Sequence, residues 1–178
     1  MNDPFATLGL PRAYALDLKA AEKTHRELSR ALHPDRYVAS GATERRLALS
    51  RAVEVNEAWR VVKDPIRRAE ALFELAGVAV GDTHEPKPAP SLLMDMMDRR
   101  EALAEARARR DIPAVRALAK EITAREEQTV AHLGAAFERA AGDRAELLPL
   151  VGALGELRYY RRFLEEAAQV SDDLAAAS

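Results

Sequence analysis

The sequence predicts an all-α protein with two helical domains. Residue types that favour helices, chiefly Ala, Leu, Glu and Arg, dominate the 178 residues, whereas β-branched residues are few. No stretch of useful length alternates between apolar and polar residues, as a half-buried strand would. Glycines and prolines gather at residues 77–90, where no helix could continue. We therefore expect an N-terminal domain over 1–76, a linker over 77–90 and a three-helix bundle over 91–174.

The composition limits the classes of function. The formal net charge is −2, so no overall field draws the chain to nucleic acid or acidic lipid. The chain has no cysteine, which excludes disulfides, thiolate metal sites and cysteine nucleophiles. No apolar run reaches the length of a membrane span, and the first residues do not resemble a signal or transit peptide. We expect a cytoplasmic protein that acts without membrane or nucleic acid.

The residues do not indicate an enzyme. The four histidines (His25, His33, His84 and His132) lack the close spacing of metal ligands. No glycine-rich loop precedes a helix, so we expect no nucleotide site. Carboxylates are abundant on predicted helix faces, but nothing indicates the cleft that an acid and a base would share. We therefore predict no catalytic residue, no metal site and no cofactor.

The first domain is expected to contain a helical hairpin with shorter helices packed against it. Apolar residues recur at helical spacing in 4–8, 17–32, 43–62 and 66–76. Asp17 is a good N-cap for the second helix. The stripe expected to be buried on that helix is Leu18, Ala21, His25, Leu28 and Leu32. The corresponding residues on the next two helices are Ala48, Ala52, Val55, Trp59, Val62, Leu72 and Leu75.

The most informative feature is the tripeptide His33-Pro34-Asp35 between two predicted helices. Pro34 fixes its own φ and biases His33 toward an extended conformation, so the preceding helix must end by about Leu32. Asp35 is then left on an exposed loop, where its carboxylate can accept from a partner's arginine or from backbone N–H groups. The tripeptide could also be an incidental turn between two helices.

A basic stripe lies on the helix before this tripeptide. Its residues, at helical spacing, are Lys19, Lys23, Arg26 and Arg30. A solvated helix face is one interpretation of such a stripe. Beside an exposed His-Pro-Asp loop, the same cations would form a docking surface for an acidic partner, setting orientation and association rate more than affinity. Glu22 and Glu27 dilute this positive charge.

The bundle is expected to contain helices over 91–110, 112–141 and 143–173. Ser91 is the expected cap of the first helix, and short connections imply antiparallel neighbours. Pro149 and Gly152 weaken the start of the third helix, which should begin later or be kinked there.

The first bundle helix carries a second apolar set away from its core side. The residues that fall on the expected core side are Leu92, Met96 and Leu103. The opposite side holds Leu93, Met94, Met97, Asp98, Glu101 and Glu105. Exposed methionines mark adaptable binding surfaces. The alternative is that the apolar members of this set contact the linker or a neighbouring helix.

Several of these runs together resemble a J-domain, in order and in spacing. They are residues 5–10, His33-Pro34-Asp35, residues 55–59 and residues 64–70. The tryptophan of Asn56-Glu57-Ala58-Trp59, the run Arg68-Ala69-Glu70 and Leu10-Pro11 resemble one branch in particular, the HscB family of iron–sulfur cluster assembly. The family's layout of J-domain, linker and C-terminal three-helix bundle agrees with this chain over nearly its whole length.

The resemblance implies two partners and two sets of site residues. The J-domain would activate a heat-shock ATPase chaperone of the HscA type through His33, Pro34, Asp35, Lys19, Lys23, Arg26 and Arg30. The bundle would bind the IscU-type cluster scaffold through Leu93, Met94, Met97, Asp98, Glu101, Glu105 and Tyr159, the last being an aromatic contact on the third helix.

The chain departs from the family pattern at three positions. His25 stands where Tyr or Phe is usual, and we expect a neutral, hydrogen-bonded core histidine. Asp98 stands where Glu is typical, and Arg99 stands where an apolar residue is common, so Arg99 should snorkel at the border of the stripe. The cysteine-rich metal site of animal mitochondrial relatives is missing, which suggests a bacterial-type protein.

The sequence therefore predicts a non-enzymatic, monomeric co-chaperone that delivers the cluster scaffold to its ATPase partner. Two other interpretations remain open. One is a general J-domain co-chaperone whose bundle binds a different client or dimerises. The other is a helical adaptor without chaperone function, in which the His-Pro-Asp run is incidental.

Overall fold

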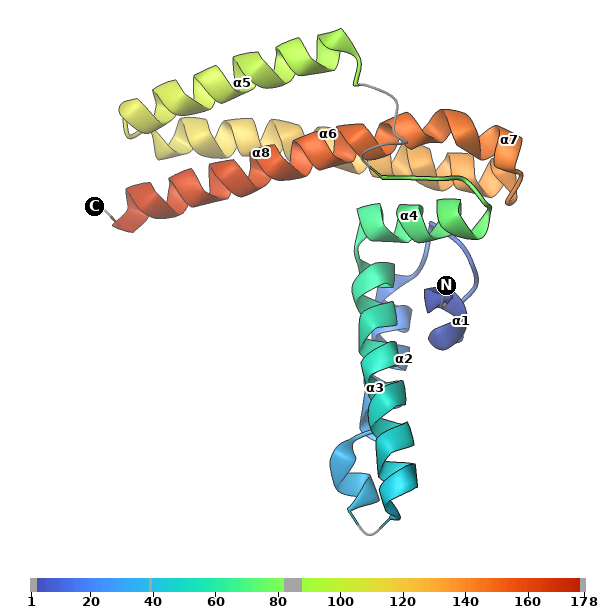
Figure 1. Cartoon of the computed structure of the whole chain (residues 1–178). Coiled ribbons are helices and arrows are strands. Elements are labelled where there is room, and N and C mark those ends of the chain that lie inside the picture. Colours follow the sequence, from blue (N-terminus) through green and yellow to red (C-terminus); the bar gives the residue numbers. More distant parts are fainter. Residues whose placement is uncertain (1–2, 39, 82–87, 177–178) are drawn as a thin grey trace. The chain divides into compact units, whose positions relative to one another are not determined.

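The computed structural model describes residues 3–38, 40–81 and 88–176, and every regular element in these ranges is a helix (Figure 1). The predicted all-α class is confirmed. The chain divides into two compact units, residues 1–79 with 137–144 and residues 80–136 with 145–178. Residues 82–87 of the expected linker lie outside the described residues, and the domain limits given above remain a prediction.

Local capping explains where the helices of the first unit begin. They are α1 (Pro4–Thr7), α2 (Leu18–Ala31), the 3₁₀ helix η1 (Pro34–Tyr37), α3 (Ala42–Lys63) and α4 (Pro65–Leu75). Asp3, Asp17 and Asp64 each precede a helix, and each carboxylate accepts from two backbone N–H groups of the first turn. The predicted N-cap Asp17 is confirmed. Pro4 and Pro65 occupy first helical positions, where a missing N–H costs nothing.

The core of the first unit is formed mainly by α1, α3 and α4. Its fully buried side chains include Phe5, Leu8, Val62 and Phe73. Of the predicted core residues, those that are buried are Ala21, Ala48, Val55, Val62 and Leu72. Leu18 is 39% exposed because it opens α2. The others are only half-buried, namely His25, Leu28, Leu32, Ala52, Trp59 and Leu75.

The predicted core omits several residues of the first unit that are buried in the structure, namely Phe5, Leu8, Tyr14, Ala58, Ile66, Ala69, Ala71, Phe73 and Val78. Phe73 was missed because buried residues occupy more than half of the circumference of α4, so they form no narrow stripe, and only the side of Arg67 and Glu74 is exposed. The ring of Phe73 lies 4.9 Å, centroid to centroid, from that of Phe137, which belongs to this unit.

Arg68 is a buried charged residue of the first unit. Its Nη1 donates to the carbonyl oxygen of Val62 at 2.8 Å, near the end of α3, and its guanidinium lies 4.8 Å from the ring centre of Tyr14. Burial lowers the pKa of Arg68, while Tyr14 and Asp64 act in the opposite direction. The side chain thus ties α4 both to the end of α3 and to the loop before α2.

The second unit is built from three long helices, as predicted. Its elements are α5 (Pro90–Ala108), most of α6 (Ile112–Ala140), most of α7 (Arg144–Leu147), the 3₁₀ helix η2 (Leu148–Leu150) and α8 (Val151–Ala176). The last turn of α6 and the first residue of α7 belong to the first unit. The late start of α8, after Pro149 in η2, agrees with the predicted weakness there. Ser91 is not the N-cap of α5: Ala89 precedes the helix without a side-chain cap, and Pro90 takes the first position, which its fixed φ suits.

The core of the second unit lies between α5, α6 and α8. Met96 and Leu103 of α5 are buried with Val115 and Ile122 of α6 and Phe163 of α8, and Leu92 packs half-buried against them. The three residues predicted to face the core from α5 are therefore confirmed. Ion pairs join α5 to α8 at the edge of this core, including Arg100 Nε to Glu166 Oε2 at 3.2 Å.

Candidate functional site

The His-Pro-Asp loop folds as the start of a short 3₁₀ helix. α2 ends at Ala31, and His33 adopts the extended conformation that Pro34 imposes. The backbone nitrogen of Asp35 donates to Nδ1 of His33 at 3.3 Å, which orients the imidazole. The Tyr37 hydroxyl donates to the Ala31 carbonyl oxygen at 3.3 Å and fastens η1 to the end of α2.

The carboxylate of Asp35 is presented to solvent. Its side chain is 85% exposed, and one carboxylate oxygen lies 3.4 Å from Nδ1 of His33. None of the residues of η1 is buried. The loop therefore holds the Asp35 carboxylate in a defined place where the core does not use it. An arginine of a partner could reach the carboxylate there.

The basic stripe of α2 is exposed over its whole length. Lys19, Lys23, Arg26 and Arg30 are all solvent-accessible. Lys23 lies 4.0 Å from Glu27, and Arg26 lies 3.9 Å from Glu22. Such exposed i,i+4 pairs contribute little, so these cations remain available to an acidic partner. We call the residues Lys19, Lys23, Arg26, Arg30, His33, Pro34 and Asp35 the HPD surface.

His25 holds α2 against α3 behind the HPD surface. Its ring is half-buried and stacks on Trp59 with centroids 5.2 Å apart and planes 13° from parallel. Its Nε2 lies 3.0 Å from Asn56 Oδ1 and 3.2 Å from Ser29 Oγ. His25 thus makes the flat stacking contact of an aromatic residue and adds hydrogen bonds. The predicted hydrogen bonding is present, but the ring is half-buried rather than enclosed in the core.

The acidic and apolar set of α5 lies on one exposed side of that helix. Met94 is 67% exposed and Met97 is 70% exposed, while Leu93 lies at the edge of this side. The acidic members Asp98, Glu101 and Glu105 are also exposed, and Glu105 pairs with Arg109 at 3.5 Å. The alternative was that Leu93, Met94 and Met97 contact the linker or a neighbouring helix. No helix among the described residues covers Met94 or Met97, and residues 82–87 of the linker lie outside those residues. We call Leu93, Met94, Met97, Asp98, Glu101 and Glu105 the α5 face.

Tyr159 lies on α8 and is half-buried, unlike the exposed residues of the α5 face. It packs against the core between the three helices, and the Arg162 guanidinium lies 4.6 Å from its ring centre. α8 packs against α5, and both helices belong to the second unit. The part of Tyr159 that remains accessible is therefore in the same unit as the α5 face.

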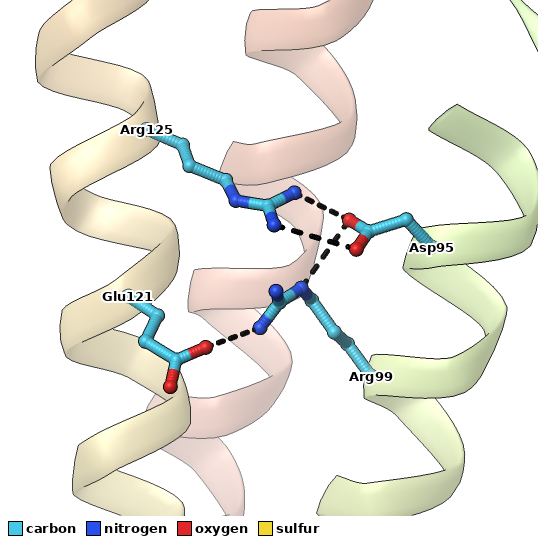
Figure 2. Close-up of polar contacts among 4 residues, drawn as sticks. All are labelled: Asp95, Arg99, Glu121 and Arg125. Carbon is cyan, nitrogen blue, oxygen red and sulfur yellow. Dashed lines mark hydrogen bonds and ion pairs between the residues drawn. The ribbon is translucent and has the colours of Figure 1, made fainter. Parts of the chain in front are cut away.

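A network of two acids and two arginines lies on the side of α5 that meets α6 (Figure 2). Arg125 of α6 donates to both oxygens of Asp95, at 2.5 and 3.4 Å. Arg99, one turn after Asp95, donates to Asp95 at 3.2 Å and to Glu121 of α6 at 2.5 Å. Two ion pairs thus cross between the helices, and they fix how α5 is turned about its own axis.

The charges of this network are mutually stabilised. Burial alone would raise the pKa of Asp95, but hydrogen bonds from Arg125 and Arg99 outweigh it and hold that pKa below its ordinary value. Burial likewise opposes the charge of Arg99, yet Glu121 and Asp95 raise its pKa. The predicted snorkelling of Arg99 to the border of the stripe is replaced by a more specific contact, because its guanidinium reaches across to α6.

The sequence contained a signal for this network that the prediction missed. Asp95 and Arg99 are four residues apart, and so are Glu121 and Arg125, in the acid-before-base order that favours helical pairs. Pairs at this spacing are satisfied within one helix, so they do not by themselves indicate that α5 and α6 are joined.

Neither a membrane-spanning helix nor a metal-ligand cluster is present in the described ranges. No helix there is both long and apolar enough to cross a membrane. Within the same ranges, no three His, Asp or Glu side chains come together as metal ligands; His84 lies outside them.

The arrangement defines a class of protein. A His-Pro-Asp loop follows a basic helix, α2, which packs on Trp59 through His25. A helical bundle follows, and two methionines are exposed on its first helix. This is the arrangement of a J-domain co-chaperone with a helical C-terminal domain. The profile of the family described as "HSCB C-terminal oligomerisation domain" matches residues 88–168.

Comparisons over the whole chain agree. The co-chaperone protein HscB homolog of Cupriavidus taiwanensis is 33% identical over 97% of this chain and 96% of its own. The homolog of Mannheimia succiniciproducens is 31% identical over 98% and 99%. Among solved structures, the chaperone HscB from Vibrio cholerae superposes with a TM-score of 0.83 at 28% identity, covering 97% of this chain and 99% of that one. Human HscB shares the fold, with a TM-score of 0.82 at 21% identity, over 95% and 82%. The chain belongs to the HscB family, the co-chaperones of iron–sulfur cluster assembly.

Proposed function

We propose that this protein carries an IscU-type cluster scaffold to a heat-shock ATPase chaperone of the HscA type and stimulates ATP hydrolysis by that chaperone. The α5 face, with Tyr159, binds the scaffold, and the HPD surface binds the chaperone. Membership of the HscB family supports both partners in general. We further propose that it acts in the cytoplasm, as a monomer, and without a catalytic group of its own.

The observation that carries the proposal is the exposure of Met94 and Met97 on a helix that is held on its other sides. Adjacent apolar side chains that are this exposed are typical of a surface that a partner covers. Unbranched methionine side chains adapt to the partner's surface, while the acids around them select a partner with positive charge. Because the network on the α6 side fixes α5, the face is pre-organised, which reduces the entropic cost of binding.

The HPD surface would act by changing the populations of chaperone states. The cations of α2 attract an acidic surface of the chaperone, and the exposed Asp35 accepts from an arginine at the junction of its ATPase and substrate domains. The hydrolysis-competent state gains this contact and becomes more populated. Since one molecule holds both partners, the scaffold reaches the chaperone at a raised effective concentration.

A calorimetric titration with the scaffold from the same organism tests the proposal. We expect micromolar affinity, weakened about tenfold or more by Met97→Ala, since a tenfold change corresponds to about 1.4 kcal/mol. Leu148→Ala is the matched control, because Leu148 is exposed on η2, away from α5, and its loss should leave the affinity unchanged. Absence of binding to the scaffold would favour the alternative of a general J-domain co-chaperone with a different client.

A further inference from the structure

A cavity of about 490 Å³ opens on the first unit between α1, α3 and α4. Its apolar lining comes from Pro4, Val53, Ala58, Val61 and Ala71. Val53 is 62% exposed, so this lining is not closed over by the fold. The volume falls within the range of about 300–1,000 Å³ that is common for binding sites.

Acidic side chains surround this apolar lining. They are Glu54 and Glu57 on α3 and Glu70 and Glu74 on α4, whereas Arg67 is the one cation among the described residues that line the cavity. Glu57 pairs with Arg60 at 3.3 Å. Glu54 and Glu74 are exposed and form no ion pair within the part of the chain that the structure describes. The rim is therefore net negative.

The cavity is separate from the HPD surface. Along a regular helix, Glu54, Glu57 and Val61 lie on nearly the opposite side of α3 from Asn56 and Trp59. Those two residues contact His25 of α2. The first unit thus presents cations on α2 and acids on the far side of α3, and a ligand in the cavity would leave α2 accessible.

We propose that this cavity binds a basic segment of a partner protein. One apolar side chain of the segment inserts between Val53, Val61 and Ala71, and flanking Lys or Arg residues pair with Glu54 and Glu74. The acidic rim repels an acidic segment, and the apolar lining gives no gain to a ligand that is only charged. The inference does not depend on the function proposed above, because it uses neither the HPD surface nor the α5 face.

The test follows backbone amide signals of the full-length, ¹⁵N-labelled protein during a peptide titration. The probe is a short synthetic peptide with a central leucine flanked by lysine and arginine, and the comparison peptide has glutamate at each basic position. We expect the basic peptide to shift the amides of Val53, Val61 and Ala71, with an affinity on the order of 10–100 µM that weakens as salt screens the rim. The acidic peptide should leave these amides unchanged.

Charge reversal provides the decisive variants. Glu54→Lys combined with Glu74→Lys should weaken the basic peptide about tenfold or more, since attraction becomes repulsion at both positions. Glu127→Lys combined with Glu165→Lys changes the net charge equally on exposed positions of α6 and α8, and should have little effect. Equal binding of both peptides, insensitivity to the first pair of reversals, or shifts confined to Met94 and Met97 on the α5 face would each overturn the proposal.

Discussion

Asp95 of α5 is held by Arg125 of α6 through both of its carboxylate oxygens, at 2.5 and 3.4 Å (Figure 2). The contact lies on the α6 side of α5, whereas Met94 and Met97 stand exposed on another side of the same helix. A carboxylate clamped by a fork of two N–H groups fixes direction as well as distance. The ion pair therefore sets which side of α5 is presented to a partner.

This contact makes the stability of the second unit depend on pH in a defined direction. The pKa of Asp95 is lowered in the folded protein, because the hydrogen bonds from Arg125 and Arg99 outweigh its burial. Its stabilising contribution is thus fully present above the ordinary carboxyl pKa of about 3.9 and is lost as the pH falls through the lower folded value. We expect Asp95→Asn to cost about 1 kcal/mol at neutral pH, after allowance for partial exposure, and almost nothing once the pH lies below the lowered pKa of the folded protein.

Urea unfolding followed by circular dichroism at neutral and acidic pH measures this difference. Asp98→Asn is the matched control, since Asp98 lies on the exposed side of α5 and forms no ion pair among the described residues. The same cost for Asp95→Asn at both pH values would contradict the assigned role of the ion pair.

A second prediction concerns Arg68. The variant Arg68→Met keeps most of the side-chain length but leaves the Val62 carbonyl oxygen without its buried donor and removes the cation above Tyr14. Losing a charged hydrogen bond to a buried carbonyl costs about 1.5–3 kcal/mol, and relief from burying the charge recovers part of it, so we expect a loss of about 2 kcal/mol. Arg67→Met changes the exposed neighbour in the same way and should cost less than about 0.5 kcal/mol. Thermal unfolding of both variants measures the contrast, and equal midpoints would show that Arg68 is not needed.

Local signals allowed most of the helices to be predicted. Asp17 was identified as a cap because a short side-chain acceptor before an apolar stripe has few other uses. The core position of Met96 and Leu103 followed from their seven-residue separation, about two helical turns. The late start of α8 followed from Pro149, which lacks an N–H.

Features that depend on packing between helices could not be predicted in the same way. The pairing of Asp95 with Arg125 exists only once α5 and α6 lie side by side, and each arginine also had a suitable acid four residues away on its own helix. The burial of Phe73 required knowing that α4 is covered on several sides. The cavity beside Val53 arises from three helices whose sequences reveal only an ordinary polar face.

The third prediction separates the two surfaces by applying one substitution to each. Asp35→Asn removes the charge of an exposed carboxylate that makes no contact in the core. Helicity and scaffold affinity should therefore remain those of the wild type. Stimulation of the chaperone's ATP hydrolysis should fall nearly to the unstimulated rate, because a neutral amide forms a much weaker contact with an arginine.

Asp98→Asn should do the reverse, weakening scaffold binding several-fold while leaving the stimulated ATPase rate without scaffold unchanged. Steady-state ATP turnover and scaffold titration, both measured on both variants, form the complete experiment. Full stimulation by Asp35→Asn would remove the HPD surface from the mechanism. A loss of ATPase stimulation in Asp98→Asn would mean that the α5 face also contacts the chaperone, since Asp98 is exposed on α5 and is not a residue of the HPD surface.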